Sequence, residues 1–104
     1  AYLSKLHSQR LDANQSSFAS SAIPLERPTN VGLLPGFEEG LVSVQDLTAQ
    51  LSANLLNPQA GERILDACSA PGGKACHLRE LEPRLKELIA CDINVNRLHR
   101  VQEN

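Results

Sequence analysis

The order of apolar and glycine-rich segments in residues 63–104 is the feature that most constrains the fold. A short apolar run at Ile64 and Leu65 leads directly into DACSAPGGK, residues 66–74. GKACHLREL then has helical spacing, LKELIACDI is a second apolar run ending at Asp92, and NVNRLHRVQEN returns to helical spacing. Strand, glycine loop, helix, strand and helix in this order are typical of a right-handed βαβ unit. We therefore predict an α/β fold, the first part of a parallel, doubly wound, Rossmann-like sheet with two of its strands present.

The residues before this pattern are less regular. YLSKLHSQRL has leucines at roughly helical spacing, and the Ser- and Asn-rich stretch after it predicts a loop. Three prolines follow, for which we expect short extended pieces and a turn at Pro35 and Gly36. SVQD matches a capping box, so we expect a helix that begins at Ser43 and ends before Pro58.

Length and composition describe an ordinary globular chain. It has 104 residues, 41% of them apolar and 21% charged, which predicts one small domain or part of one. Because there is no methionine, even at position 1, we expect a piece of a longer protein. Residues 1–57 carry a net charge of −2, three bases against five acids, and residues 58–104 balance seven against seven. Since nucleic-acid binders usually carry a basic stripe, we expect other parts of such a protein to hold any polyanion.

The three cysteines are not spaced as a structural zinc site requires. Cys68, Cys76 and Cys91 lie eight and fifteen residues apart, so there is no C-x-x-C pair, and the three histidines are scattered. We expect no metal. No signal peptide and no apolar run near 18 residues is visible, so we expect no membrane partner and a reducing, cytoplasmic setting.

The glycine loop fits neither of two familiar phosphate-binding motifs. A triphosphate loop ending at Gly73-Lys74 needs glycine at position 68 and Ser or Thr at 75, but the chain has Cys68 and Ala75. The dinucleotide fingerprint also fails, because the loop's glycines are the adjacent pair Gly72 and Gly73.

A nucleoside site remains consistent with the loop. Glycines after a parallel strand let the backbone approach a ligand, and the next helix offers free N–H groups. Asp92 lies 20 residues beyond Gly72, where such folds place an acceptor for ribose hydroxyls, although it could instead cap the following helix. Asp66 could hold loop N–H groups or contact a ligand with an amino or sulfonium group. These acids favour S-adenosylmethionine over ATP.

Several longer stretches together resemble one protein family. LPGFEEGLVSVQD, AQL, LNPQAGERILDACSAPGGKACHL and ACDINVNRLHRVQEN are similar to the RsmB/Sun family of ribosomal RNA cytosine-5 methyltransferases, from about Leu34 to Asn104. The resemblance implies that residues 34–104 are the N-terminal part of a methyltransferase domain, and that residues 1–33 end an upstream RNA-binding region and linker. It also implies that Asp92 binds ribose and that the cofactor loop consists of Cys68, Ser69, Ala70, Pro71, Gly72, Gly73 and Lys74. Ser69 and KACHL depart mildly from the family pattern.

The resemblance further implies where catalysis takes place. A cysteine thiolate adds to C6 of cytosine so that C5 attacks the methyl group, and a base then removes the C5 proton. The family places this cysteine and a second one, used for release, in later Pro-Cys and Thr-Cys contexts. The chain contains neither dipeptide. We therefore expect no catalytic residue in this chain, which alone should be inactive.

Two other functions stay open on the sequence. One is an RNA-binding or ribosome-assembly module with a degenerate methyltransferase fold; the other is a non-RNA methyltransferase, which would carry an Asn/Asp-Pro-Pro-Tyr motif instead.

Several reactive or charged side chains have a plainer interpretation. We expect Cys68 to be a small packing residue, and Cys76 and Cys91 to lie in the core. Arg97 and Arg100 are expected on a solvated helix face. Lys74 is either an exposed residue at a helix start or a contact to cofactor or substrate.

Overall fold

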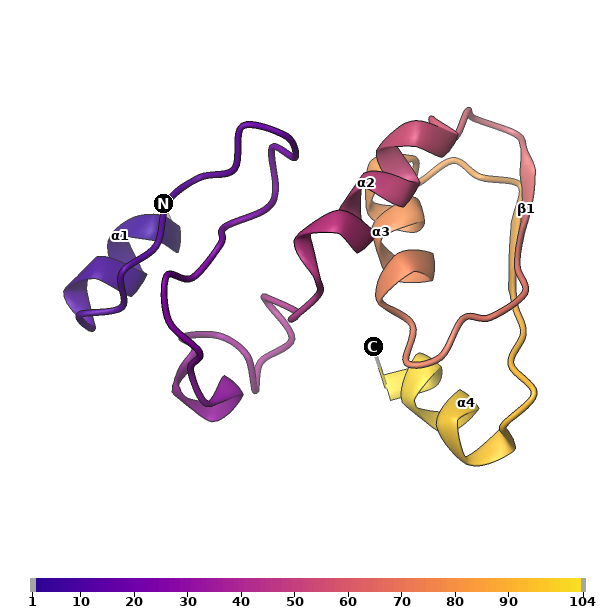
Figure 1. The fold of residues 1–104 in the computed structure, drawn as a ribbon. Helices are drawn as coiled ribbons and strands as arrows, with labels where there is room; N and C mark the ends of the chain where they lie inside the picture. Colours follow the sequence, from indigo (N-terminus) through magenta and orange to yellow (C-terminus); the bar gives the residue numbers. More distant parts are fainter. Residues whose placement is uncertain (1, 104) are drawn as a thin grey trace. The chain divides into compact units, whose positions relative to one another are not determined.

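The chain forms two compact units, Ala1–Leu47 and Thr48–Asn104, in a computed structural model that describes residues 2–103 (Figure 1). Ala1 and Asn104, the end residues of the predicted segments 1–33 and 34–104, lie outside the described residues. The elements are α1 (Tyr2–Ser8), the 3-10 helix η1 (Val31–Leu33), α2 (Leu47–Leu56), β1 (Arg63–Asp66), α3 (Gly73–Leu81), β2 (Glu87–Ala90) and α4 (Val95–Glu103).

The first unit has a small core of its own. The core is formed by Leu6 of α1 together with Ala13 and Leu34, and partly buried apolar side chains pack against it. An antiparallel bridge between Ala13 and Leu25 closes the segment that follows α1. The two strands of the sheet lie entirely in the second unit.

The predicted turn at Pro35 and Gly36 is present in the first unit. Gly36 has φ +84°, and its carbonyl accepts a hydrogen bond from the Leu41 N–H at 2.8 Å. A Cβ at position 36 would lie 3.1 Å from the Leu41 Cβ. Both the left-handed backbone and the close approach therefore favour glycine here.

Helix α2 begins later than the capping box predicts. It starts at Leu47, and residues 42–46 are not helical, so the expected start at Ser43 is wrong. Val44, the first apolar residue of the expected helix, is 60% exposed. A helical turn there would bury no apolar face, and tertiary packing rather than a short local pattern stabilises most helices. The predicted end is confirmed, since Asn57 adopts a left-handed φ of 50° just before Pro58.

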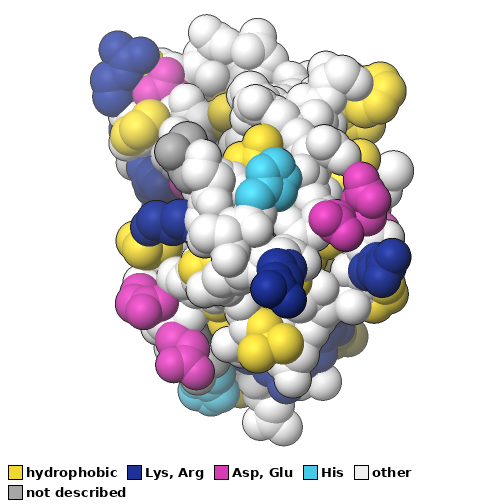
Figure 2. Space-filling model, turned by 90° about the vertical axis from the view of Figure 1, so that its left-hand side faces the viewer, with side chains coloured by type: hydrophobic (Ala, Val, Ile, Leu, Met, Phe, Trp, Pro, Cys, Tyr) yellow, Lys and Arg dark blue, Asp and Glu magenta, His cyan; other side chains and the backbone are white. Residues whose placement is uncertain are grey.

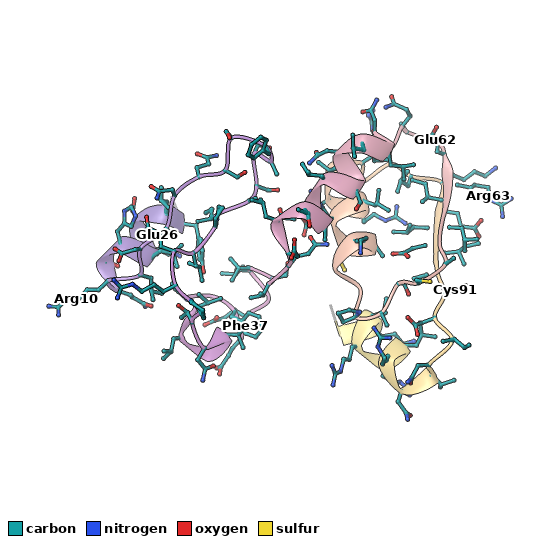
Figure 3. All side chains as sticks on the ribbon, in the orientation of Figure 1. Arg10, Glu26, Phe37, Glu62, Arg63 and Cys91 are labelled. Atoms are coloured by element: carbon teal, nitrogen blue, oxygen red, sulfur yellow. The ribbon has the colours of Figure 1, made fainter. Side chains whose placement is uncertain are left out.

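The second unit contains the predicted parallel sheet. β1 and β2 pair in parallel with Arg63 opposite Glu87 and Asp66 opposite Ala90, and α3 connects them. The α/β fold is thereby confirmed. The two faces of the strands differ: Ile64 is partly buried, whereas Leu65 is 63% exposed. Figure 3 shows Arg63 projecting from β1 away from α3, and its guanidinium pairs with the Glu87 carboxylate.

Helices α3 and α4 start where the spacing predicts, and their apolar faces are partly covered. Ala75 and Leu78 of α3 are buried, but Leu81 is 43% exposed. In α4, Leu98 is partly buried and Val95 is 69% exposed. Within residues 2–103, no helix is long and apolar enough to cross a membrane.

Candidate functional site

The predicted loop lies at the carboxyl ends of the two parallel strands. It connects β1 to α3, and the segment after β2 runs beside it. The Cys91 N–H donates to the Asp66 carbonyl at 2.8 Å, and the Ser69 N–H donates to the Cys91 carbonyl at 2.9 Å. These bonds continue the strand pairing beyond β2, so the loop is fastened to the sheet by backbone groups.

A tight turn directs the loop into α3. The Gly72 N–H donates to the Ser69 carbonyl at 2.6 Å, and the Ala70-Pro71 peptide between them is cis. Gly72 has φ 115°, a conformation that other residues rarely adopt, and its carbonyl accepts from the Cys76 N–H. The first N–H groups of α3 therefore open onto the loop, as in sites that bind anions or polar ligands at a helix start.

Asp92 meets the loop at Ala70. Its Oδ2 accepts a hydrogen bond from the Ala70 N–H at 3.1 Å, and its Oδ1 accepts from the Asn94 N–H at 2.9 Å. These bonds to the Asn94 and Ala70 amides, with the nearby charge of Arg97, hold the pKa of Asp92 below its ordinary value against a smaller opposing effect of burial. The carboxylate is thus kept ionised, and each oxygen retains a lone pair for a further donor.

The alternative in which Asp92 caps the following helix is not what the structure contains. Asn94 takes the capping position of α4, since its Oδ1 accepts from the Arg97 N–H at 3.2 Å and its carbonyl accepts from the Leu98 N–H. Ribose binding by Asp92 stays a prediction.

Arg97 does not belong to a purely solvated helix face. Its side chain is exposed, as expected, but Nη2 also donates to the Ala70 carbonyl at 2.9 Å, a contact that the sequence did not predict. Helical periodicity places residues around one helix only, whereas the long arginine side chain reaches from the first turn of α4 to the neighbouring loop. Arg100 also interacts with another group.

Two buried polar atoms beside the loop have no partner among the described residues. They are Asp66 Oδ2 and Ser69 Oγ, and Ser69 is only 4% exposed. The other oxygen of Asp66 accepts from the Cys68 N–H at 3.3 Å, so Asp66 does hold a loop N–H group, as one of its two predicted roles requires. Because buried polar groups are normally paired, the two unpaired atoms fit a ligand that brings hydroxyl or amino groups.

The cysteines are more exposed than expected. Cys68 and Cys91 are exposed, and only Cys76 on α3 is partly buried. Burial, and to a smaller extent the negative charge of Glu80, raises the pKa of the Cys76 thiol. Cys91 lies directly after the end of β2, two residues beyond Ile89, which is 42% exposed. Figure 3 shows Cys91 beside the loop that follows the strands.

The remaining residues of the loop segment differ in exposure. Pro71 and Lys74 are exposed, whereas Ala70 is 8% exposed and Gly72 is buried. Gly73, which opens α3, is partly buried. His77, also on α3, is buried, and its Nδ1 has no partner in the part of the chain that the structure describes.

Charges of both signs are mixed on the surface. Figure 2 shows Lys and Arg side chains interspersed with Asp and Glu on the face drawn, without a continuous basic stripe among the described residues of that face. Within residues 2–103, no three His, Cys, Asp or Glu side chains are grouped as a metal site would need.

A glycine turn at the end of one parallel strand, tied to an acid after the next strand, is typical of the first part of a Rossmann-like fold. Comparison with known sequences makes the class more specific. The family 16S rRNA methyltransferase RsmB/F matches residues 53–104, half of the chain, and the chain therefore belongs to this family. The resemblance seen in the sequence is confirmed.

Individual relatives agree with this assignment. Ribosomal RNA small subunit methyltransferase B of Pseudomonas syringae pv. tomato is 50% identical over 103 residues, which are 99% of this chain and 23% of that protein. The protein of the same name from Shewanella oneidensis is 54% identical over 103 residues, which are 99% of this chain and 24% of that protein. The chain thus spans about a quarter of the length of these curated relatives.

Solved structures share the fold. The crystal structure of PH0851 matches with a TM-score of 0.87 and 27% identity, covering 97% of this chain and 23% of that one. NSun6 from Pyrococcus horikoshii with SFG matches with a TM-score of 0.66 and 32% identity, covering 79% of this chain and 22% of that one.

Proposed function

We propose that the complete protein containing this chain transfers a methyl group from S-adenosylmethionine to C5 of a cytosine in small-subunit ribosomal RNA, in the cytoplasm. Membership of the RsmB/F family and the names of relatives about 50% identical over nearly the whole chain support the reaction and the RNA. The parts of the complete protein outside this chain would provide most of the RNA contacts, because the charges here nearly balance.

Within that protein, residues 34–104 would begin the methyltransferase domain and residues 1–33 would end the upstream RNA-binding region and linker. The compact units divide later, between Leu47 and Thr48, and the family match begins at residue 53. Residues 34–46 would then lead into the methyltransferase domain.

The cofactor site would consist of Cys68, Ser69, Ala70, Pro71, Gly72, Gly73, Lys74 and Asp92. The bond from the Ala70 N–H to Asp92 Oδ2 carries this proposal, because it joins the two parts of the site predicted separately. Asp92 would accept from ribose hydroxyls through its remaining lone pairs. The NSun6 neighbour, solved with the S-adenosylmethionine analogue SFG, adds support from a related fold.

The residues of this chain would bind and orient rather than react. When bound, S-adenosylmethionine supplies the methyl group on a sulfonium centre. The Gly72 turn lets the backbone approach a ligand, and the ionised Asp92 keeps the Ala70 amide in place. The catalytic cysteines would lie elsewhere in the complete protein, since neither a Pro-Cys nor a Thr-Cys dipeptide occurs in this chain.

The test uses the complete protein, small-subunit ribosomal RNA and labelled S-adenosylmethionine. We expect methyl transfer to cytosine C5, and calorimetric titration should show S-adenosylhomocysteine binding that Asp92→Ala weakens about tenfold or more, since a charged acceptor is lost. Glu87→Ala is the matched control, because Glu87 lies on β2 at the opposite end of the strand.

The outcomes separate the competing functions. RNA binding without cofactor binding or methyl transfer would instead support an RNA-binding or assembly module. If Asp92→Ala leaves cofactor binding unchanged, the ribose-binding role of Asp92 is refuted, whereas the proposed reaction is not.

A further inference from the structure

Arg97 occupies an electrostatically unfavourable position in α4. It follows the cap residue Asn94 by three positions and so lies in the first helical turn, which contains no acid. The helix dipole favours acids in this turn and disfavours cations. Since the effect is small for an exposed side chain such as Arg97, a single favourable interaction elsewhere can offset it.

That interaction is with the backbone of the loop. Arg97 Nη2 donates to the Ala70 carbonyl at 2.9 Å, while Asp92 Oδ2 accepts from the Ala70 N–H at 3.1 Å. Ala70 is 8% exposed, and both of its backbone groups are held by charged side chains, the partly buried Asp92 and the exposed Arg97. Hydrogen bonds with a charged partner are about twice as strong as neutral ones.

Ala70 also lies within the turn that leads into α3. It is the second residue of the turn from Ser69 to Gly72, and Gly72 directs the chain into α3. Arg97 of α4 therefore holds the turn through the Ala70 carbonyl. Asp92, in the segment after β2, holds the same turn through the Ala70 N–H.

We propose that Arg97 is a positioning residue for the cofactor loop: its guanidinium holds the Ala70 carbonyl so that the loop is arranged before the cofactor binds. This inference rests on the proposed function. Without Arg97, the Ala70 carbonyl would lose this charged donor and the turn would be held from one side only, so that binding would have to order the loop, which lowers affinity.

A purely structural role would predict a different result, and Arg79 provides the matched control. Arg79 of α3 donates through Nη1 to the Leu85 carbonyl at 3.1 Å, which is also a bond from an arginine to a loop carbonyl. That loop precedes β2, at the opposite end of the sheet from the glycine turn. Arg97→Ala removes one such bond, and Arg79→Ala removes this bond together with a longer one to the Pro83 carbonyl at 3.4 Å. Only Arg97→Ala touches the cofactor loop.

The experiment titrates the complete protein with S-adenosylhomocysteine and measures Tm and the methylation kinetics of each variant. We expect Arg97→Ala to weaken binding about tenfold and to raise KM for S-adenosylmethionine similarly, with KM for RNA unchanged. Arg79→Ala should lower Tm about as much as Arg97→Ala does, but its affinity for S-adenosylhomocysteine should stay within about twofold of the wild type.

The inference is overturned if Arg97→Ala binds within about twofold of the wild type, or if both variants lose affinity equally. Should Arg97→Ala fail to fold, Arg97→Gln decides in its place, since its shorter neutral side chain does not reach the carbonyl: a loss of threefold or more at unchanged Tm supports the role, and unchanged affinity refutes it. A wild type that binds no S-adenosylhomocysteine would instead refute the proposed function.

Discussion

At the scale of single residues, the loop depends on backbone groups that charged side chains hold in place. Asp92 and Arg97 bind the N–H and the carbonyl of Ala70, and Asp66 accepts from the N–H of Cys68. Apart from Lys74, the loop residues themselves are small. We therefore expect the conformation of the loop to matter more for binding than the chemical reactivity of its side chains.

Cys68 illustrates this point and leads to a prediction. The hydrogen bond from Cys68 to the Asp66 carboxylate uses the backbone N–H, and the residue is exposed. We expect Cys68→Ser in the complete protein to keep S-adenosylhomocysteine affinity and methyl transfer within about twofold, because serine preserves the backbone and nearly the size. Calorimetry and a methylation assay check this. Loss of the covalent RNA adduct in this variant would show that Cys68 is a nucleophile.

The sequence predicted some of these residues and missed others. Asp92 follows an apolar run, a position where α/β folds place a ligand acceptor, so its location was predictable. Arg97 was interpreted from helical spacing alone. The sequence feature that could have indicated a contact of Arg97 is its place in a first helical turn, where a cation is disfavoured. Which group it would reach depends on a loop 27 residues away.

At the scale of elements, α4 is defined by a cap that the sequence analysis did not single out. The Asn94 side chain accepts from the Arg97 N–H, which is the third N–H of the helix. This is the usual role of asparagine at a helix start. The same interaction fixes the backbone from which the Arg97 guanidinium extends to the loop.

This cap gives an element-scale prediction. Asn94→Ala should destabilise the protein by about 1 kcal/mol, the usual cost of losing a capping side chain, and Asn94→Ser should restore most of it. Urea unfolding of both variants, followed by circular dichroism, measures the difference. Equal stability of the alanine and wild-type proteins would show that the cap contributes nothing.

The ends of helices were predictable where a glycine or proline marks the boundary and the packing of the helix agrees with it. α3 starts at Gly73 and α2 ends before Pro58, as predicted, because glycine and proline act through their own backbone geometry. The start of α2 was wrong because a capping box at Ser43 helps a helix only where the following turn has something to pack against. Val44 remains 60% exposed.

At the scale of the whole chain, the open side of the sheet is a prominent apolar surface. Leu65 and Ile89 are register partners, and they are 63% and 42% exposed. Adjacent exposed apolar side chains on a short two-stranded sheet favour association. The 104-residue chain produced alone therefore presents this surface to its copies.

We predict that the isolated chain self-associates and that the double variant Leu65→Thr/Ile89→Thr shifts it toward monomer. Threonine keeps the preference for strand conformation while removing apolar surface. Sedimentation velocity at several concentrations measures the change, with Leu33→Thr as a control, since Leu33 is 64% exposed in the other unit. An isolated chain that is monomeric throughout would contradict this.

The sequence by itself determined the type and order of the elements in residues 63–103 and the identity of the glycine loop, because periodicity and glycine geometry act over a few neighbouring residues. Only the tertiary structure decided that the peptide of Ala70 lies between Asp92 and Arg97, 22 and 27 residues further along the chain. Such contacts depend on the register of β1 with β2 and on the path of the turn. Those are set by packing between distant segments rather than by any local pattern.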